Sequence, residues 1–264
     1  MDLELKNKRA LVSGSTAGIG LAIARALAAE GASVIVNGRT LERVEQAVQE
    51  LRAAVPNGNF QTLAADLGGP AGVQQAVGKF PEVDILVNNL GIFEPKAFIE
   101  IPDADWFRFF EVNVMSGVRL SRQYLPGMVK RNWGRIVFIS SESGLQIPAE
   151  MIHYGMTKTA QLAVARGLAE TTAGTAVTVN SVLPGPTASE GVTTFVGQMA
   201  EGRGVGRKQV EKEFFENVRP SSLLKRFQRT EEIADVVAFV CSPRASGING
   251  ATLRADGGVV KSIG

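Results

Sequence analysis

The 264-residue chain is predicted to fold as a single α/β domain, a doubly wound parallel sheet of seven strands flanked by helices. Three observations predict this class. Short β-branched runs alternate with longer amphipathic stretches, which is the pattern of repeated βα units. A glycine-rich turn joins the first run to the first amphipathic stretch. Hydrophobic residues make up 45% of the chain, enough for a large core, and no break in composition marks a linker.

Seven runs have the length and composition of strands. They cover residues 9–13, 33–37, 60–64, 84–88, 135–140, 176–182 and 251–255. Six stretches between them have helical periodicity, at residues 19–30, 40–54, 72–80, 103–130, 153–171 and 230–240. The connection from 185 to 222 is longer than an ordinary βα loop. Because loops of that length tend to be functional, we expect a lid over a substrate site there.

The composition argues against several classes of function. The net charge is only +2 and the basic residues are scattered, so no nucleic-acid-binding surface is expected. The longest apolar runs are strand-sized and the N-terminus is acidic, so we expect no membrane span, no secretory signal and a cytoplasmic location. One cysteine, Cys241, and one histidine, His153, leave no basis for a disulfide or a metal site. A serine hydrolase would depend on His153, and no G-x-S-x-G elbow supports one.

Tyr154 and Lys158 are four residues apart in a predicted helix, so their side chains would share one face. A tyrosine is a poor acid or base at neutral pH, because its pKa is about 10. A fixed cation nearby stabilises the phenolate and lowers that pKa by roughly 1–3 units. Such a tyrosine could exchange a proton with an alcohol or ketone oxygen. Alone, the pair is more often an ordinary surface pair, so the interpretation depends on the other motifs.

The first βα turn has the sequence Ser13-Gly14-Ser15-Thr16-Ala17-Gly18-Ile19-Gly20, with the spacing G-x-x-x-G-x-G. Glycines at such a turn permit a tight reversal and let a pyrophosphate approach the N-terminus of the next helix. In its strand–turn–helix context the motif predicts a dinucleotide site. A plain tight connection is the alternative.

Taken in order, the motifs resemble those of the classical short-chain dehydrogenase/reductase family, whose fold is Rossmann-like. The resemblance extends from about Leu5 to Val260. Its motifs are the glycine turn, Asp66-Leu67, Asn88-Asn89-Leu90-Gly91, Asn113, Ser141 thirteen residues before Tyr154, Lys158, Asn180 to Pro184-Gly185, and Asp256-Gly257-Gly258. Any one of them could arise by chance, whereas the ordered set is specific.

The resemblance implies an NAD(P)-dependent oxidoreductase that interconverts a carbonyl and an alcohol. Tyr154 would be the general acid or base, and Lys158 would lower its pKa and bond the nicotinamide ribose. Ser141 would hold the substrate oxygen, although a plain turn serine is the alternative. Asn113 would fix a water that links Lys158 to solvent, or would bond backbone at a helix kink.

The resemblance also implies a set of cofactor-binding positions. They are Gly14, Ser15, Thr16, Gly18, Ile19, Gly20, Arg39, Asp66, Leu67, Asn89, Gly91, Tyr154, Lys158, Pro184, Gly185 and Thr187. NAD enzymes usually carry an acidic residue where this chain has Gly38, and Arg39 follows with a guanidinium suited to a 2′-phosphate. NADP is therefore favoured over NAD, although Arg39 could stack on adenine without selecting, and Ala17 lacks the second basic residue of many NADP-dependent relatives.

Two positions depart from the family pattern. Ser13 replaces the commoner threonine but keeps the hydroxyl, and Leu90 replaces an alanine beside the adenosine ribose. We expect cofactor binding to survive both changes, because the contacts there are mainly to the backbone.

The substrate pocket implied by the resemblance combines residues after Gly91, the segment before Tyr154 and the lid. Its candidate residues are Ser141, Ser143, Ile147, Met151, Phe93 and Phe195. Aromatic and methionine side chains suggest a largely apolar small molecule that carries a ketone or secondary alcohol. Because relatives are commonly tetramers, a homo-oligomer, either tetramer or dimer, is expected.

Two alternatives stay open at this point. One is a different reaction on the same scaffold, such as epimerisation or dehydration with bound cofactor. The other is a regulatory protein that senses NADP without turnover, although such a protein would not need Asn113, Ser141, Tyr154 and Lys158 together.

Overall fold

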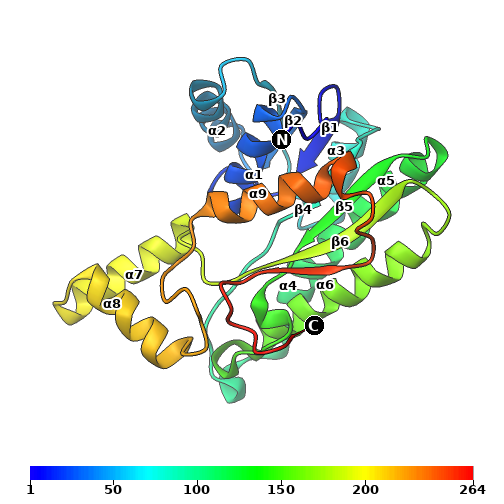
Figure 1. The fold of residues 1–264 in the computed structure, drawn as a ribbon. Coiled ribbons are helices and arrows are strands. Elements are labelled where there is room, and N and C mark those ends of the chain that lie inside the picture. The colour runs from blue at the N-terminus through cyan, green and yellow to red at the C-terminus, as the bar shows by residue number, and fades with distance from the viewer. Residues whose placement is uncertain (264) are drawn as a thin grey trace.

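A computed structural model describes residues 1–263, apart from the side chain of Phe195. The described chain forms one sheet of parallel strands in the order β3-β2-β1-β4-β5-β6-β7 (Figure 1). The strands are β1 (Arg9–Val12), β2 (Ser33–Gly38), β3 (Asn59–Ala64), β4 (Ile85–Asn88), β5 (Gly134–Ile139), β6 (Val177–Pro184) and β7 (Thr252–Ala255). The prediction of a doubly wound, seven-stranded parallel sheet is confirmed.

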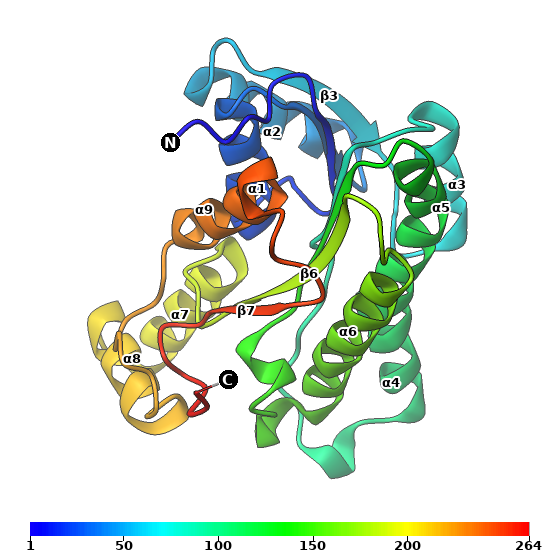
Figure 2. The same cartoon turned by 45° about the vertical axis from the view of Figure 1, so that its right-hand side comes forward.

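Helices cover both faces of the sheet (Figure 2). One face carries α1 (Gly18–Ala29), α2 (Leu41–Ala54) and α9 (Thr230–Cys241). The other carries α3 (Pro70–Lys79), α5 (Ser116–Lys130) and α6 (Ile152–Glu170), and α4 (Asp103–Phe110) packs beside α6 (Figure 2). Each layer buries its own core against the sheet, and β5 and β6 are buried along their whole length, as expected of strands covered on both sides. Short 3₁₀ turns lie at Phe98–Glu100, Glu142–Gly144, Ala149–Met151 and Pro243–Ala245.

The helix predicted over 103–130 contains an irregular turn. Between α4 and α5, Glu111–Met115 form a π-type turn in which the N–H of Ser116 donates to the carbonyl of Glu111, five residues back. Such turns are frequent at functional sites, because they disturb the regular backbone pairing of the helix. Asn113 lies in the middle of this one.

The long connection after β6 is largely helical. It contains α7 (Glu190–Arg203), α8 (Arg207–Glu213) and a π-type turn at Phe214–Val218. These helices project beyond the end of the sheet (yellow in Figure 1) and bury a small core of their own around Val196, Ala200 and Val210. The connection, expected from the sequence to be a lid, is therefore a small folded unit.

Because the strands are parallel, the carboxyl ends of the central strands all lie at the same end of the sheet. The chain passes from β3, at one edge, to β4, which pairs with β1, so the strand order reverses between β1 and β4. In open α/β sheets this reversal opens a crevice where ligands bind. The glycine turn after β1 and the segments after β4, β5 and β6 all lie at this end.

Candidate active site

A cavity of about 580 Å³ lies at the carboxyl ends of the strands, beneath the connection that follows β6. Its walls come from the segments after β4 and β5, from the start of α6, from the end of β6, and from α7, α8 and the turn after them. Three of the four predicted catalytic side chains, Ser141, Tyr154 and Lys158, line it. Asn113 lies fully buried.

Helix α6 holds Tyr154 and Lys158 one turn apart, as the spacing predicts. The ammonium of Lys158 lies 5.6 Å from the centre of the Tyr154 ring. Ser141 follows the end of β5 and lines the same cavity as Tyr154. The rings of Phe93 and Tyr154 meet in an edge-to-face arrangement, with their centres 6.4 Å apart. The arrangement thus brings a phenol, a hydroxyl and an ammonium together in one cavity.

Burial sets the protonation of both ionisable groups. It raises the pKa of Tyr154 well above its usual value, and the charge of Glu142 raises this pKa further, whereas Ser141 and Arg219 lower it. Burial also lowers the pKa of Lys158 to about 7. Without a bound cofactor, Tyr154 is therefore a neutral phenol that can donate a proton.

Asn113 is held by hydrogen bonds within the protein. Its side-chain oxygen accepts from the N–H of Ile92 at 2.7 Å, and its amide donates to the carbonyl of Ile92 and the hydroxyl of Thr157, both at 3.0 Å. Its main-chain carbonyl accepts from the side chain of Gln161 at 2.6 Å. The side chain of Gln161, a residue not predicted from the sequence, is thus the hydrogen-bond donor to the carbonyl of Asn113. The only sequence signal for it is its position three residues after Lys158, on the same side of the helix.

The glycine turn is fixed by asparagine side chains. A Cβ atom on Gly20 would lie 2.4 Å from the carbonyl oxygen of Gly14, so only glycine fits there. Asn89 donates to the carbonyls of Ser13 and Gly14 at 2.9 and 3.0 Å, and Asn37 accepts from the N–H of Gly14 at 3.0 Å. Asn37 is a second residue missed from the sequence, where it is simply the end of a strand.

Of the two residues that depart from the family pattern, Leu90 packs partly buried against the core and Ser13 keeps its hydrogen bonds. The hydroxyl of Ser13 accepts from the N–H groups of Asn89 and Leu90 at 2.9 and 3.0 Å. The shorter side chain therefore retains the hydrogen bonds that anchor the segment after β4.

The other predicted cofactor residues fall into four groups. Ile19, Gly91, Pro184, Gly185 and Thr187 line the cavity, as do Asn89, Tyr154 and Lys158. Arg39 and Asp66 are exposed, and Gly14, Thr16 and Gly18 lie in the glycine turn. Ser15 and Leu67 are buried: the Ser15 hydroxyl donates to the carbonyl of Val12, and Leu67 belongs to the core, so neither side chain is free to contact a cofactor.

The predicted substrate residues do not all reach the cavity. Ser141, Ser143, Met151 and Phe93 line it. Ile147 is not among the lining residues: its side chain is about half exposed and packs over Gly155, where an added Cβ would lie 2.8 Å from it. The side chain of Phe195 lies outside the described part of the structure.

Comparison with known proteins establishes the family. Residues 8–199 match the short chain dehydrogenase family. The chain is a classical short-chain dehydrogenase/reductase. It is 51% identical to the oxidoreductase YvaG of Bacillus subtilis over the full length of both chains. It is 34% identical to the D-beta-hydroxybutyrate dehydrogenase of Cupriavidus necator, with 97% of this chain and 99% of that one covered.

A solved relative has nearly the same fold. The L-sorbose reductase of Gluconobacter frateurii, crystallised with NADPH and L-sorbose, superposes with a TM-score of 0.93 at 30% identity, over 100% of both chains. The dehydrogenase/reductase described here is accordingly an oxidoreductase that uses a nicotinamide cofactor. Its glycine turn fits such a group, because Gly20 packs directly against the carbonyl of Gly14 and the side chain of Asn89 and so keeps the turn tight at the start of α1.

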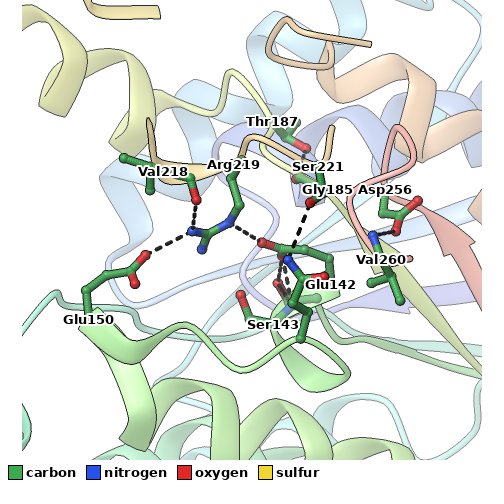
Figure 3. Close-up of polar contacts among 12 residues, drawn as sticks. Glu142, Ser143, Glu150, Gly185, Thr187, Val218, Arg219, Ser221, Asp256 and Val260 are labelled. Atoms are coloured by element: carbon green, nitrogen blue, oxygen red, sulfur yellow. Dashed lines mark hydrogen bonds and ion pairs between the residues drawn. The ribbon is translucent and has the colours of Figure 1, made fainter. Parts of the chain in front are cut away.

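This dehydrogenase/reductase also carries a charged cluster at the cavity that was not predicted as a unit (Figure 3). Arg219, which follows the π-type turn at 214–218, forms ion pairs with Glu142 at 3.0 Å and Glu150 at 2.9 Å. Glu142 in turn accepts hydrogen bonds from the hydroxyl of Ser141 and the N–H of Ser143. The sequence contains no signal for this cluster, because Arg219 is 77 residues from Glu142.

Residues 1–263 contain neither a candidate metal site nor a candidate membrane-spanning helix. No group of three or more His, Cys, Asp or Glu side chains in residues 1–263 could hold a metal ion. Within the same range, none of the helices combines the length and hydrophobicity that a membrane span requires.

Proposed function

We propose that this protein interconverts a ketone and a secondary alcohol, with Tyr154 as general acid–base and NADP as the preferred cofactor. The proposal rests mainly on one observation: Ser141, Tyr154 and Lys158 all line the cavity, which lies at the end of the sheet where the glycine turn is found. Phenol, hydroxyl and ammonium are the groups that this chemistry needs within reach of one substrate oxygen.

Each side chain has a distinct task in carbonyl reduction. The nicotinamide, when bound, supplies hydride to the carbonyl carbon. Tyr154 donates its phenolic proton to the carbonyl oxygen as negative charge develops there. Lys158 stabilises the resulting phenolate. The Ser141 hydroxyl, which donates to Glu142 in this structure, turns to donate to the carbonyl oxygen of the substrate. In alcohol oxidation the proton moves the other way.

The preference for NADP is supported by the surroundings of Gly38. A Cβ atom there would lie 2.5 Å from Thr16 Cγ2 and 3.0 Å from Val44 Cγ2, so the acidic side chain of an NAD enzyme has no room. Arg39 is exposed next to it, with a guanidinium suited to a phosphate. The L-sorbose reductase, which has nearly the same fold, was crystallised with NADPH.

The cavity supports a largely apolar small-molecule substrate. Most of the surface that lines it is hydrophobic. The apolar members include Phe93, Met151, Val192, Val196, Met199, Phe214 and Phe227. Such a lining suits a hydrophobic ligand whose single polar group is oriented by a few hydrogen bonds.

A homo-oligomer, dimer or tetramer, and a cytoplasmic location complete the proposal. Exposed aromatic side chains on and before α4, Phe98 and Phe107, support an interface between copies, because they leave an apolar surface uncovered. The cytoplasmic location rests on the sequence alone.

The test is oxidation of NADPH and NADH against a panel of apolar ketones and diketones, for the wild type and for Tyr154→Phe. We expect turnover with NADPH, and a loss of about 10²–10⁴-fold in Tyr154→Phe with cofactor binding nearly unchanged. Turnover retained by Tyr154→Phe would refute the mechanism. Binding of NADPH without turnover of any compound would favour a sensor, and a product other than the alcohol would favour epimerisation or dehydration.

A further inference from the structure

Arg219 links the connection after β6 to the floor of the cavity. Its side chain is nearly buried, with 8% of the residue exposed. Its Nε donates to Glu142 at 3.0 Å, and one terminal nitrogen donates both to Glu150 and to the carbonyl of Val218 at 2.9 Å (Figure 3). One guanidinium thus joins the 214–218 turn to the two 3₁₀ turns that lie between Ser141 and Tyr154.

Glu142 is the acidic group of this cluster nearest the chemistry. It is only 5% exposed, and one carboxylate oxygen accepts from the Ser141 hydroxyl and, at 2.9 Å, from the Ser143 N–H. A buried carboxylate beside the proposed proton donor opposes formation of a phenolate, because like charges repel strongly where water is excluded.

The two charges act on Tyr154 in opposite directions. Burial is the main cause of the raised pKa of Tyr154; the Glu142 carboxylate raises it further and the Arg219 guanidinium lowers it. The other groups that face the phenol are Ser141, at the end of β5, and Lys158, from α6. Glu150, on the turn before α6, faces Arg219. Only Arg219 among these groups comes from the connection that covers the cavity.

We propose that Arg219 is a positioning residue that neutralises Glu142 beside Ser141 and thereby couples the docked connection to proton transfer at Tyr154. The inference rests on the proposed role of Tyr154. When the 190–222 segment covers the cavity, Glu142 is paired and the phenolate can form. When the segment lifts, Glu142 is left unpaired beside the phenol and proton transfer is suppressed.

The first experiment is the pH profile of kcat/KM for alcohol oxidation. In Arg219→Met we expect the midpoint assigned to Tyr154 to rise by about 1–3 pH units, the range for a neighbouring charge. In Glu142→Gln it should fall, and in the double variant it should return toward the wild-type value. If Arg219 only fastened the segment, the double variant would stay as impaired as Arg219→Met, and this outcome would overturn the inference.

Arg203 provides a matched control. It pairs with Glu213 at 2.6 Å within the same connection, and its side chain is about half exposed. Arg203→Met removes an ion pair of the covering segment without touching Glu142, so the midpoint should not move. An equal shift in Arg203→Met and Arg219→Met would also count against the inference.

A second measurement is independent of turnover. The chain has two tyrosines, and Tyr124 donates to the carbonyl of Phe80 in the core. In a Tyr124→Phe background, ¹³C at the phenolic carbon reports Tyr154 alone in the NADP⁺ complex. Ionisation should begin at lower pH in Glu142→Gln and at higher pH in Arg219→Met. If wild type lacked turnover, the proposed function would fail, yet this titration would still decide the role of Arg219: an unchanged signal in both variants would overturn it.

Discussion

The ammonium of Lys158 donates to the side-chain oxygen of Gln161 at 3.2 Å, in a part of the protein where both residues are almost fully buried. The amide nitrogen of Gln161 donates onward to the main-chain carbonyl of Asn113 at 2.6 Å. This carbonyl lies in the π-type turn, and Lys158 also donates to the carbonyl of Ile139 at 2.9 Å. The side chain of Gln161 therefore links Lys158 to the π-type turn, where the sequence predicted a bound water.

Replacing Gln161 by leucine should impair both stability and turnover. Leucine fills a similar volume, but it leaves the Asn113 carbonyl without its donor and removes one acceptor from Lys158. The unfolding free energy should fall by about 1–3 kcal/mol, the usual penalty for a buried polar group left unsatisfied. We expect kcat to fall by about tenfold, equivalent to about 1.4 kcal/mol, because the lysine loses part of its support.

Chemical denaturation and steady-state kinetics measure the two effects. Gln161→Glu keeps an acceptor for Lys158 and should retain more activity than leucine does, with a pH profile displaced by the added carboxylate. Gln49→Leu, on the exposed side of α2, is the control. Equal activity in the wild type and Gln161→Leu would mean that the bridge has no part in catalysis.

The fold could be predicted because its signals are local. Each β-branched run is a strand within a few residues of its predicted ends, and the amphipathic stretches between them are helices. The π-type turn at 111–115 escaped prediction, since its residues continue the helical periodicity and only the Ser116–Glu111 hydrogen bond distinguishes it. The helices after β6 escaped because their apolar residues pack mainly on one another rather than on the sheet, as the cluster around Val196 and Val210 shows.

The site could be predicted only where residue type and spacing carry the chemistry. Tyr154 and Lys158 are visible because one helical turn separates them. Gln161 and Arg219 are not, because a glutamine in a helix and an arginine in a connection are ordinary until the fold brings them to Asn113 and Glu142. Long-range contacts of this kind depend on the packed chain.

Arg39→Glu should weaken the binding of NADP far more than the binding of NAD. The substitution replaces a cation suited to the 2′-phosphate by a carboxylate that repels it and can accept from ribose hydroxyls. We expect the loss for NADP to be about 2 kcal/mol or more, as for a hydrogen bond to a charged group. Cofactor titration by fluorescence gives both dissociation constants. Equal losses for the two cofactors would remove the argument for Arg39, and Arg52→Glu, on the exposed side of α2, is the charge-matched control.

Gly20→Ala should disrupt the cofactor turn. The added Cβ would lie 2.4 Å from the Gly14 carbonyl oxygen and 2.5 Å from the amide nitrogen of Asn89, so the turn must move. Overpacking of this kind costs about 1–3 kcal/mol of stability, and NADPH affinity should fall with it. Gly78→Ala is the matched control, because no atom outside its own stretch of helix lies within 4 Å of the added Cβ and the helix should gain up to about 1 kcal/mol. Normal NADPH binding by Gly20→Ala would contradict this account of the turn.

His153 should make the protein sensitive to acid. Its ring is fully buried against Phe109, with ring centres 4.1 Å apart, and near Trp106, and neither nitrogen has a hydrogen-bond partner within the described structure. Burial lowers the pKa of His153 below its usual value. The folded protein therefore disfavours protonation of His153, whereas in the unfolded chain this histidine is readily protonated below about pH 6.5.

The sign of the pH dependence follows from this difference. Above about pH 6.5 the histidine is neutral in both states and does not alter stability with pH. As the pH falls below that value, the unfolded chain takes up a proton that the folded protein resists, and stability drops by up to about 1.4 kcal/mol per pH unit until the folded pKa is reached. His153→Phe removes the titrating group and keeps an aromatic ring against Phe109. Between about pH 7 and pH 5, the range of histidine titration, the melting temperature of the wild type should therefore fall by more than that of the variant. Parallel curves would show that His153 is not the group responsible.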